Sequence, residues 1–198
     1  MKTVKLQTPV GEDTVRGLEV GDTVYVSGKI YTARDMAHLR MVNSSEEGKE
    51  LPVDLHGGVI FHAGPVVKKE DGGYTLSVIG PTTSIRMEPY SGFVGGLGVK
   101  AIIGKGGMVE GTRRALAEQG MVYLQAPPGC AVVLGEQVKR IEDVHWIELG
   151  VPEAMWVLEV EEFGPCIVGM DSKGNSVYRD IQIKGKETIE KMFETGEA

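Results

Sequence analysis

A regular alternation of short apolar strands and helical segments over residues 74–124 is the feature that most limits what this chain can fold into. Strands are predicted at 74–79, 99–103 and 121–124, and a helix is expected in each interval between them. Successive strands joined through helices favour parallel pairing with right-handed crossovers. The sequence therefore predicts an α/β fold, with parallel strands in this part of the chain.

The rest of the chain is predicted to add further strands and helices. Alternating or apolar runs predict strands at 3–7, 14–18, 23–31, 59–67, 154–160 and 166–170. Capping and turn residues predict helices at 32–42, directly after 82–84, and at 108–119, 129–141 and 186–194. The glycine-containing turn at 69–73 is typical of a hairpin. Length leaves one or two domains open, and we interpret residues 1–198 as a single domain.

Composition excludes several classes of function. Hydrophobic residues make up 41% of the chain and charged residues 25%, as in soluble globular proteins. The net charge of -7 argues against nucleic acid as a partner, because binding to phosphates needs a basic stripe. Neither a signal peptide nor an apolar run long enough to cross a bilayer is found, so no membrane association and a cytoplasmic location are expected.

The cysteines and histidines give little indication of a metal site. Cys130 and Cys166 lie far apart in apolar surroundings and lack metal-ligand spacing, so both are predicted to be buried and inert. Two cysteines also cannot supply the usual thiolates of an iron–sulfur cluster. His56 and His62 lack cysteine or carboxylate partners at ligand spacing, which favours core or interface histidines over metal ligands. We therefore predict that no residue of this chain binds a metal.

The stretch 80–107 combines groups that suit a small anion. Its candidates are Thr82, Thr83, Arg86, Lys105 and Gly106. Backbone N–H groups at helix N-termini bind anions, and cationic side chains strengthen such a site. The glycine-rich run 104–107 follows a strand and opens a helix, although its spacing is not that of a Walker loop. Taken alone, this run is better explained by an ordinary strand-to-helix turn with a surface lysine.

A second candidate segment lies earlier, at residues 32–35. Thr32 is a good N-cap, and Asp35 three residues later can bond back to it, so this segment reads as a capping box. The capping box does not explain Arg34, since a cation in the first turn of a helix opposes the helix dipole. A solvated surface arginine is the alternative. We interpret this segment and residues 80–107 as parts of one site.

Four motifs taken together carry a family resemblance. They lie at residues 31–35, 80–87, 104–108 and 145–154. In this order they resemble the β subunit, or C-terminal domain, of class I fumarate hydratase, and the closely similar L(+)-tartrate dehydratase β subunit shares the pattern. The resemblance covers essentially the whole chain. It implies a swivelling β/β/α domain with mixed sheets and a helical layer.

The resemblance also implies that the chain is half of an enzyme. In the family an α subunit, or an N-terminal domain in fused forms, carries three cysteines that hold a [4Fe-4S] cluster. This chain would bind no cluster alone and would be active only with the α subunit. An α2β2 assembly and a homo-oligomer are both compatible with this arrangement.

The same resemblance assigns roles to individual residues. Arg34, Arg86 and Lys105 match the family's cationic substrate ligands. Thr82 matches the hydroxyl that is proposed as the catalytic base, and Asp35 follows Arg34 as in the family pattern, where it could orient the arginine. Thr83 and Gly106 adjoin these positions and are counted with the substrate-binding residues. A shift of one residue would exchange Thr82 and Thr83, so either hydroxyl could act.

The implied chemistry suits these residue types. Malate and fumarate are dianions, and an arginine binds a carboxylate through two N–H bonds of a planar fork. The expected reaction is the reversible hydration of fumarate to (S)-malate. L(+)-tartrate dehydration is the alternative, and a methylated dicarboxylate is not separated from either by sequence. From another class, a non-catalytic dicarboxylate-binding module would need the same cations.

Overall fold

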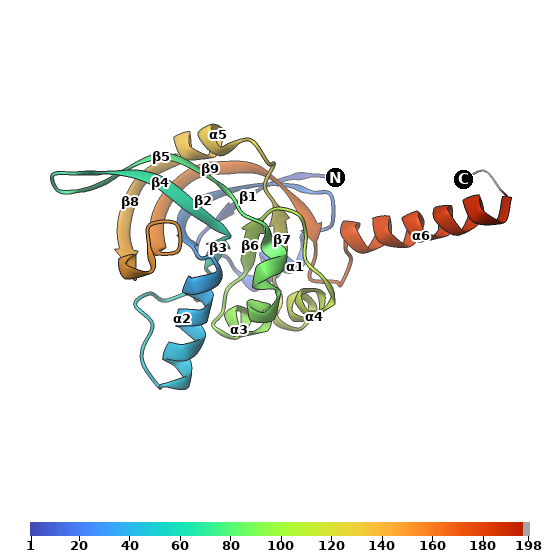
Figure 1. The fold of residues 1–198 in the computed structure, drawn as a ribbon, viewed down its shortest axis with the longest axis horizontal. Coiled ribbons are helices and arrows are strands. Elements are labelled where there is room, and N and C mark those ends of the chain that lie inside the picture. The colour runs from blue at the N-terminus through green and yellow to red at the C-terminus, as the bar shows by residue number, and fades with distance from the viewer. Residues whose placement is uncertain (196–198) are drawn as a thin grey trace.

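The computed structural model describes residues 1–195, and a curved seven-stranded sheet forms its centre (Figure 1). Its strands are β1 (Thr3–Gln7), β2 (Thr23–Thr32), β3 (Val59–Phe61), β6 (Ala101–Gly104), β7 (Val122–Gln125), β8 (Val138–His145) and β9 (Met155–Met170). The spatial order is β1-β2-β3-β6-β7-β9-β8, and β9 also pairs with β2. Strands β2, β3, β6, β7 and β9 therefore close into a barrel-like ring.

Both strand directions occur in this sheet. The pairs β1–β2, β2–β3, β3–β6 and β6–β7 are parallel. All pairs that involve β9 are antiparallel. The predicted α/β class with mixed sheets is confirmed.

A two-stranded hairpin forms the second sheet. Strands β4 (Ala63–Glu70) and β5 (Gly73–Pro81) pair antiparallel, and in Figure 1 the tip of this hairpin extends away from the body. Helix α5 (Ala131–Glu136) packs against β5, where a Cβ atom added at Gly135 would lie 3.4 Å from the Cα of Val78. The helix backbone at Gly135 therefore lies within van der Waals distance of β5.

The remaining helices surround the ring. They are α1 (Glu12–Arg16), α2 (Asp35–Glu46), α3 (Ser91–Gly96), α4 (Glu110–Gln119), α6 (Val177–Thr195) and two 3-10 helices, η1 (Ser84–Tyr90) and η2 (Ile147–Leu149). Figure 1 shows α2, α3 and α4 on one side of the sheet and α6 extending away from the body. Among residues 1–195, none of the helices combines the length and apolar character needed to cross a membrane.

Two apolar clusters hold these layers together. The first includes Phe61 and Phe163, whose rings meet edge to face with centroids 5.2 Å apart. The second includes Met41, Ile102 and Leu116, so it joins α2 and α4 to the sheet. Burying large apolar side chains is the main stabilising contribution in such a fold.

Several predicted elements differ in the structure. Residues 14–18, predicted as a strand, fall largely in helix α1, which ends at Arg16. The predicted strand 59–67 is interrupted at His62, so β3 joins the large sheet and β4 joins the hairpin. As a result, strand 74–79 does not pair with β6, whereas the parallel crossover from β6 through α4 to β7 is present.

The C-terminal third also differs. The helix predicted over 129–141 ends at Glu136, and the unpredicted strand β8 follows, paired with β9. The strands predicted at 154–160 and 166–170 are parts of one 16-residue strand. Gly164 and the proline that follows it indicate a strand break, but the strand continues through them. Gly164 has φ +153°, and a Cβ atom added there would lie 2.8 Å from the carbonyl oxygen of Val24, so a glycine is needed at this position. Helix α6 begins nine residues before the predicted 186.

Candidate active site

Three of the predicted site residues are hydrogen-bonded to one another. Arg86 Nε donates to both carboxylate oxygens of Asp35, at 3.1 Å each, and Arg86 Nη2 donates to Thr82 Oγ1 at 3.0 Å. These residues come from the start of α2, from η1 and from the end of the β5 segment. The fold therefore unites the two sequence segments that were interpreted as one site.

Thr82 is held by its backbone as well as by its side chain. Its N–H donates to the carbonyl oxygen of His62 at 2.7 Å, which fixes it beside the end of β3. Its hydroxyl oxygen accepts from the Arg86 guanidinium, so the hydroxyl hydrogen remains available to another acceptor. A cation that donates to this oxygen also favours its deprotonated form.

Opposing effects act on the pKa of Asp35. Partial burial raises the pKa of this carboxyl, but the hydrogen bonds and charge of Arg86, with a smaller contribution from Arg34, outweigh burial and hold it below its usual value. Asp35 is therefore ionised at neutral pH and orients Arg86. This differs from the expectation that Asp35 would orient Arg34.

Lys105, Gly106 and Thr83 form the second part of the site. Thr83 and Lys105 are paired in an isolated parallel bridge, so the two loops run side by side. Gly106 has φ +82°, a conformation that favours glycine, and a Cβ atom there would lie 4.0 Å from the Thr83 methyl group. Within residues 1–195, the Lys105 ammonium makes no hydrogen bond or ion pair, which leaves its three donors for a ligand.

Arg34 lies at the start of α2 and has a different carboxylate partner. Its Nη2 lies 3.0 Å from Glu153 Oε1, and the other oxygen of Glu153 accepts from the backbone N–H of Met36 at 3.0 Å. The Nε of Arg34 is buried and has no hydrogen-bond partner in the described part of the chain. Glu153 thus binds both the guanidinium of Arg34 and the N-terminus of α2.

The predicted capping box at Thr32 is wrong. Thr32 is the last residue of β2 and is fully buried, where its Oγ1 accepts from the backbone N–H of Trp156 at 3.0 Å. The N-cap position of α2 is Arg34. Strand pairing extends β2 to Thr32, so the helix starts too late for Thr32 to cap it, and Asp35 bonds Arg86 instead.

The expectation that the 104–107 turn opens directly into a helix N-terminus that binds an anion is also wrong. Helix α4 begins at Glu110, and Glu88 already occupies its N-terminus. The Glu88 carboxylate accepts from the backbone N–H groups of Val109, at 3.0 Å, and Thr112, at 2.7 Å. An acidic side chain at this position satisfies the free N–H groups and the helix dipole, so anion binding here depends on cationic side chains.

A buried polar cluster lies beneath these loops, and we call it the polar floor. It consists of His38, His62, Ser84 and Tyr123, all of which are buried. The rings of His38 and His62 meet edge to face with centroids 5.3 Å apart, and His38 Nδ1 lies 2.9 Å from the carbonyl oxygen of Arg34. His62 was predicted to be a core or interface histidine, and the structure places it in the core.

Burial controls the protonation of this floor. Desolvation lowers the pKa of His38 to about 4, despite the opposing Arg34 carbonyl and Asp35 charge. The pKa of His62 is lowered well below its usual value, first by desolvation and then by His38 and Arg86. Both imidazoles are therefore neutral near pH 7.

This chain does not fit the role of an iron–sulfur ligand set. Cys166 is buried, and desolvation raises the pKa of its thiol to about 12, which disfavours the thiolate that binds metal. The prediction of burial is therefore confirmed for Cys166. Cys130, at the N-cap of α5, is half-buried. In the part of the chain that the structure describes, no group of three or more potential ligands surrounds a metal position.

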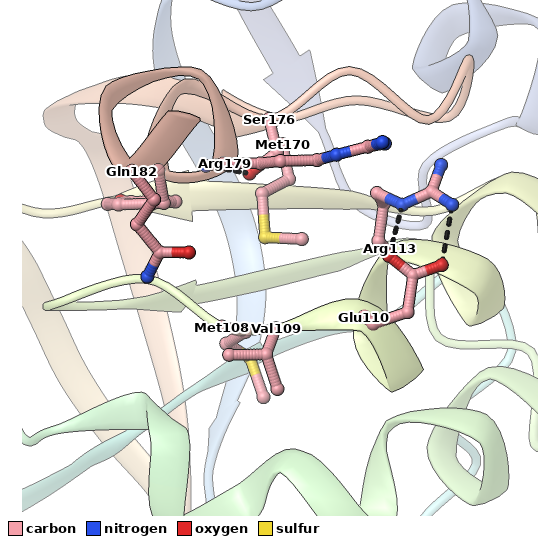
Figure 2. A pocket seen from close by; sticks show the side chains of 9 residues that line it. Met108, Val109, Glu110, Arg113, Met170, Ser176, Arg179 and Gln182 are labelled. Atoms are coloured by element: carbon pink, nitrogen blue, oxygen red, sulfur yellow. Dashed lines mark hydrogen bonds and ion pairs between the residues drawn. The ribbon is translucent and has the colours of Figure 1, made fainter. Parts of the chain in front are cut away.

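A separate pocket lies between the start of α4, the end of β9 and the first turns of α6 (Figure 2). Its volume is about 210 Å³, and its walls include Met108, Met170 and Arg179. Figure 2 shows Glu110 and Arg113 paired beside it. The residues predicted for the dicarboxylate site are absent from its described lining, so this pocket is distinct from that site.

Sequence reasoning missed several residues that contact the site. Glu153 belongs to the downstream motif, but its partner Arg34 is more than 100 positions away, so spacing could not indicate the pair. Ser84 directly follows the two threonines, and this adjacency was the available sign of its importance. The apolar neighbours of Tyr123 predicted a buried strand and gave no sign that its hydroxyl reaches this region.

The chain is similar in sequence to a known protein family. Residues 1–181 match the family model described as the fumarase C-terminus. The L(+)-tartrate dehydratase subunit beta of Escherichia coli K12 is 42% identical over 173 residues, which cover 87% of this chain and 85% of that protein. A Methanocaldococcus jannaschii protein named as a candidate L(+)-tartrate dehydratase subunit beta is 46% identical over 181 residues, covering 90% and 93% of the two chains.

A longer relative shows the same region within a larger chain. A Geobacillus stearothermophilus protein named as a candidate fumarate hydratase class I is 43% identical over 193 residues. The match covers 96% of this chain but 36% of that protein. The fold and these matches define a domain of the hydro-lyase type. This chain belongs to the fumarase C-terminus family.

Proposed function

We propose that this chain is the β subunit of a class I hydro-lyase and that it catalyses, with an α subunit, the reversible hydration of fumarate to (S)-malate. The observation that carries this proposal is the contact of one guanidinium, Arg86, with both Thr82 and Asp35. It joins a substrate-binding cation to the candidate proton-transfer hydroxyl. The names of the relatives support the reaction class.

Charge supports a dicarboxylate as the substrate. Arg34, Arg86 and Lys105 carry three positive charges, while Asp35 and Glu153 offset two of them. Both arginines keep N–H donors that are not used by these carboxylates, and the Lys105 ammonium has no partner among residues 1–195. A dianion would use these donors for its two carboxylates.

Thr82 is our candidate for proton transfer. A hydroxyl is a weak base at neutral pH unless a nearby cation stabilises the alkoxide. Arg86 donates directly to the Thr82 oxygen and supplies such a cation. In the hydration direction the Thr82 hydroxyl would give its proton to a substrate carbon, and in dehydration Thr82 would remove it. Arg34, Arg86 and Lys105 would stabilise the enolate-like charge that develops on the adjacent carboxylate.

The iron–sulfur cluster of such an enzyme would be held by the α subunit. Burial disfavours the thiolate of Cys166, and among residues 1–195 neither cysteine belongs to a group of three or more potential metal ligands. Relatives of similar length are named as beta subunits, which supports a heteromeric enzyme. We also propose a single domain and a cytoplasmic location, where free thiols persist.

L(+)-tartrate dehydration is the second candidate reaction. It is favoured because the two relatives that match this chain over most of both lengths carry that name. Malate and L(+)-tartrate differ by one hydroxyl group, which Thr83 or Lys105 could bind in addition to the carboxylates. Arg34, Arg86 and Lys105 would serve either substrate equally.

The proposal is tested with the chain purified alone and with its α subunit under anaerobic conditions. The pair should hydrate fumarate or dehydrate malate or L(+)-tartrate, whereas the isolated chain should bind no stoichiometric iron and sulfide and should show no turnover. Iron analysis and a panel of hydroxy dicarboxylates are the measurements. Turnover by the chain alone would contradict the proposal, and so would tight malate binding by an isolated monomer whose α-subunit complex is inactive towards the whole panel.

A further inference from the structure

Ser84 lies at the point where the two substrate loops meet. It follows Thr82 and Thr83 in sequence, and its backbone N–H donates to the carbonyl oxygen of Lys105 at 3.0 Å. The preceding residue, Thr83, forms the parallel bridge with Lys105. The backbone of Ser84 therefore joins the segment that carries the hydroxyls to the segment that carries the ammonium.

The side chain of Ser84 is buried beneath the same junction. Tyr123 donates its hydroxyl hydrogen to Ser84 Oγ at 3.0 Å, and His62 Nδ1 lies 3.0 Å from the same oxygen. Ser84 has no exposed surface. A Cβ atom added at Gly104 would lie 1.8 Å from Ser84 Oγ, so the hydroxyl sits directly against the β6 backbone. A methyl group at Gly104 would displace this hydroxyl.

Both partners of the Ser84 hydroxyl also contact the substrate loops. The carbonyl oxygen of His62 accepts from Thr82 N–H at 2.7 Å. A backbone hydrogen bond from Gly107 reaches the Tyr123 hydroxyl, although burial dominates and raises the pKa of Tyr123 to about 12. Tyr123 thus stays protonated and donates to Ser84 at any working pH. Ser84 Oγ is therefore linked to Thr82 through His62. Through Tyr123 it is linked to the turn that follows Lys105.

We propose that Ser84 is a positioning residue that fixes the separation of Thr82 and Lys105 through its hydrogen bonds to His62, Tyr123 and the Lys105 backbone. This inference rests on the proposed function of that site. A serine hydroxyl can accept and donate at once, whereas a cysteine thiol does both weakly and an alanine methyl group does neither. A displacement of reacting groups by about 1 Å can lower a rate by two orders of magnitude, so a small loosening of this junction affects turnover strongly.

Ser91 offers a matched control. It is another buried serine, and its Oγ lies 2.6 Å from Thr112 Oγ1, in a contact that joins α3 to α4. Ser84→Ala leaves both His62 Nδ1 and the Tyr123 hydroxyl without their serine partner. After Ser91→Ala, Thr112 Oγ1 still donates to Glu88, so this substitution should cost less stability, and melting temperatures are measured for both variants. The two serines differ in that Ser84 touches the Lys105 loop, whereas Ser91 belongs to the contact between the two helices.

The experiment compares Ser84→Ala with Ser91→Ala in the α–β complex and in the isolated chain. In the complex, Ser84→Ala should lower kcat about tenfold or more, and Ser91→Ala less than about twofold. Combined with Lys105→Ala, the loss from Ser84→Ala should shrink, because residues that act through one another are not additive. A merely structural serine would give the same loss in both backgrounds.

A second measurement does not depend on enzymatic activity. In the isolated chain, Ser84→Ala should shift the backbone amide resonances of Thr83, Lys105 and Gly106 by NMR, and Ser91→Ala should leave them in place. The inference is overturned if the two variants perturb these amides equally, whether or not the complex is active. A complex that is inactive towards every dicarboxylate, combined with selective amide shifts in Ser84→Ala, would overturn the proposed function and support Ser84 as the junction of the two loops.

Discussion

Arg34 and Arg86 are the same residue type in the same site, yet the fold uses them differently. Arg34 pairs with Glu153, and their side chains are 27% and 19% exposed. Arg86 pairs with Asp35, and these side chains are 42% and 37% exposed. Glu153 also binds the N-terminus of α2, whereas Arg86 reaches the Thr82 hydroxyl.

This difference suggests that one arginine pair stabilises the fold and the other serves catalysis. The Arg34–Glu153 pair is less exposed and is tied to a helix end, so its loss should affect stability as well as binding. The Arg86–Asp35 pair is open to solvent, where an ion pair contributes little to stability, so its value should lie in catalysis. Substitutions on the two sides should therefore divide between stability and turnover.

The largest expected effect is that of Thr82→Val, which removes the hydroxyl on the Arg86 side. If this hydroxyl exchanges the substrate proton, kcat in the α–β complex should fall by about a hundredfold or more while KM changes little. Thr82→Ser should retain part of the activity, because the hydroxyl remains. Steady-state kinetics on the reconstituted complex measures both.

Thr83→Val is the control for the Thr82 prediction. Thr83 is exposed and adjacent, so it tests a one-residue error in the assignment. A loss confined to Thr83→Val would transfer the proton-transfer role to Thr83. Full turnover in Thr82→Val would remove Thr82 from the mechanism.

Arg86→Lys should be next in size. An ammonium keeps the charge but cannot bond Asp35, Thr82 and a carboxylate in the planar geometry of a guanidinium. Losing one such contact should cost about 2 kcal/mol of transition-state binding, roughly thirtyfold in kcat/KM. The melting temperature should hardly change. A variant with near-normal kcat/KM would show that Arg86 has a structural role alone.

The polar floor should make the chain sensitive to acid. His38 faces the Arg34 carbonyl, the Asp35 carboxylate and the rings of His62 and Tyr90. Its pKa is about 4 in the fold, below the ordinary value of 6.5, so between these pH values the unfolded chain binds more protons. Stability should therefore fall as the pH drops, by roughly 1.5 kcal/mol from His38 between about pH 6.5 and pH 5.

Urea unfolding of the isolated chain across this pH range measures the acid sensitivity. His38→Gln should reduce the slope by the share that His38 contributes, since the substituted side chain cannot take up a proton, while the buried His62 maintains the rest of the dependence. His56→Gln, on an exposed loop, is the control for the substitution itself. An unchanged slope in His38→Gln would mean that the buried imidazole of His38 does not control acid stability.

The smallest expected effect compares the two carboxylates. Glu153→Gln should lower stability by about 1 kcal/mol, because it removes charge from both Arg34 and the α2 N-terminus. For a chain of this size that corresponds to about 2–4 °C in melting temperature. Asp35→Asn should change stability by less than about 0.5 kcal/mol but lower kcat/KM more than Glu153→Gln does. The reverse pattern would contradict the division between the two arginines.

Much of the fold was predictable where local patterns agree with tertiary structure. Strand β2 has β-branched residues and the β4–β5 connection has turn glycines, so this strand and the hairpin turn were predicted, although β4 begins at Ala63 and not at the predicted residue 59. Strand β8 was missed because residues 138–145 are partly exposed and lie directly after α5, where helical spacing continues by chance. Its pairing with β9 decides its conformation.

The residue types of the candidate site were predictable from the sequence. The contacts between these residues were less so. The segments that hold Arg34, Thr82, Arg86 and Lys105 were found, since hydroxyls and cations beside glycine turns form an unusual pattern. The pairing of Asp35 with Arg86, and of Arg34 with Glu153, joins residues 51 and 119 positions apart. Charge alone does not choose between such partners.

The sequence by itself determined the α/β class, the residue types of the site and the shortage of cysteines in this chain, because periodicity, turn chemistry and side-chain chemistry are local properties. The tertiary structure decided which carboxylate meets which arginine. It also placed Glu88 at the N-terminus of α4 and brought Ser84 against the loop that carries Lys105. These contacts depend on how strands and helices pack, which brings distant residues together by burying apolar surface elsewhere in the molecule.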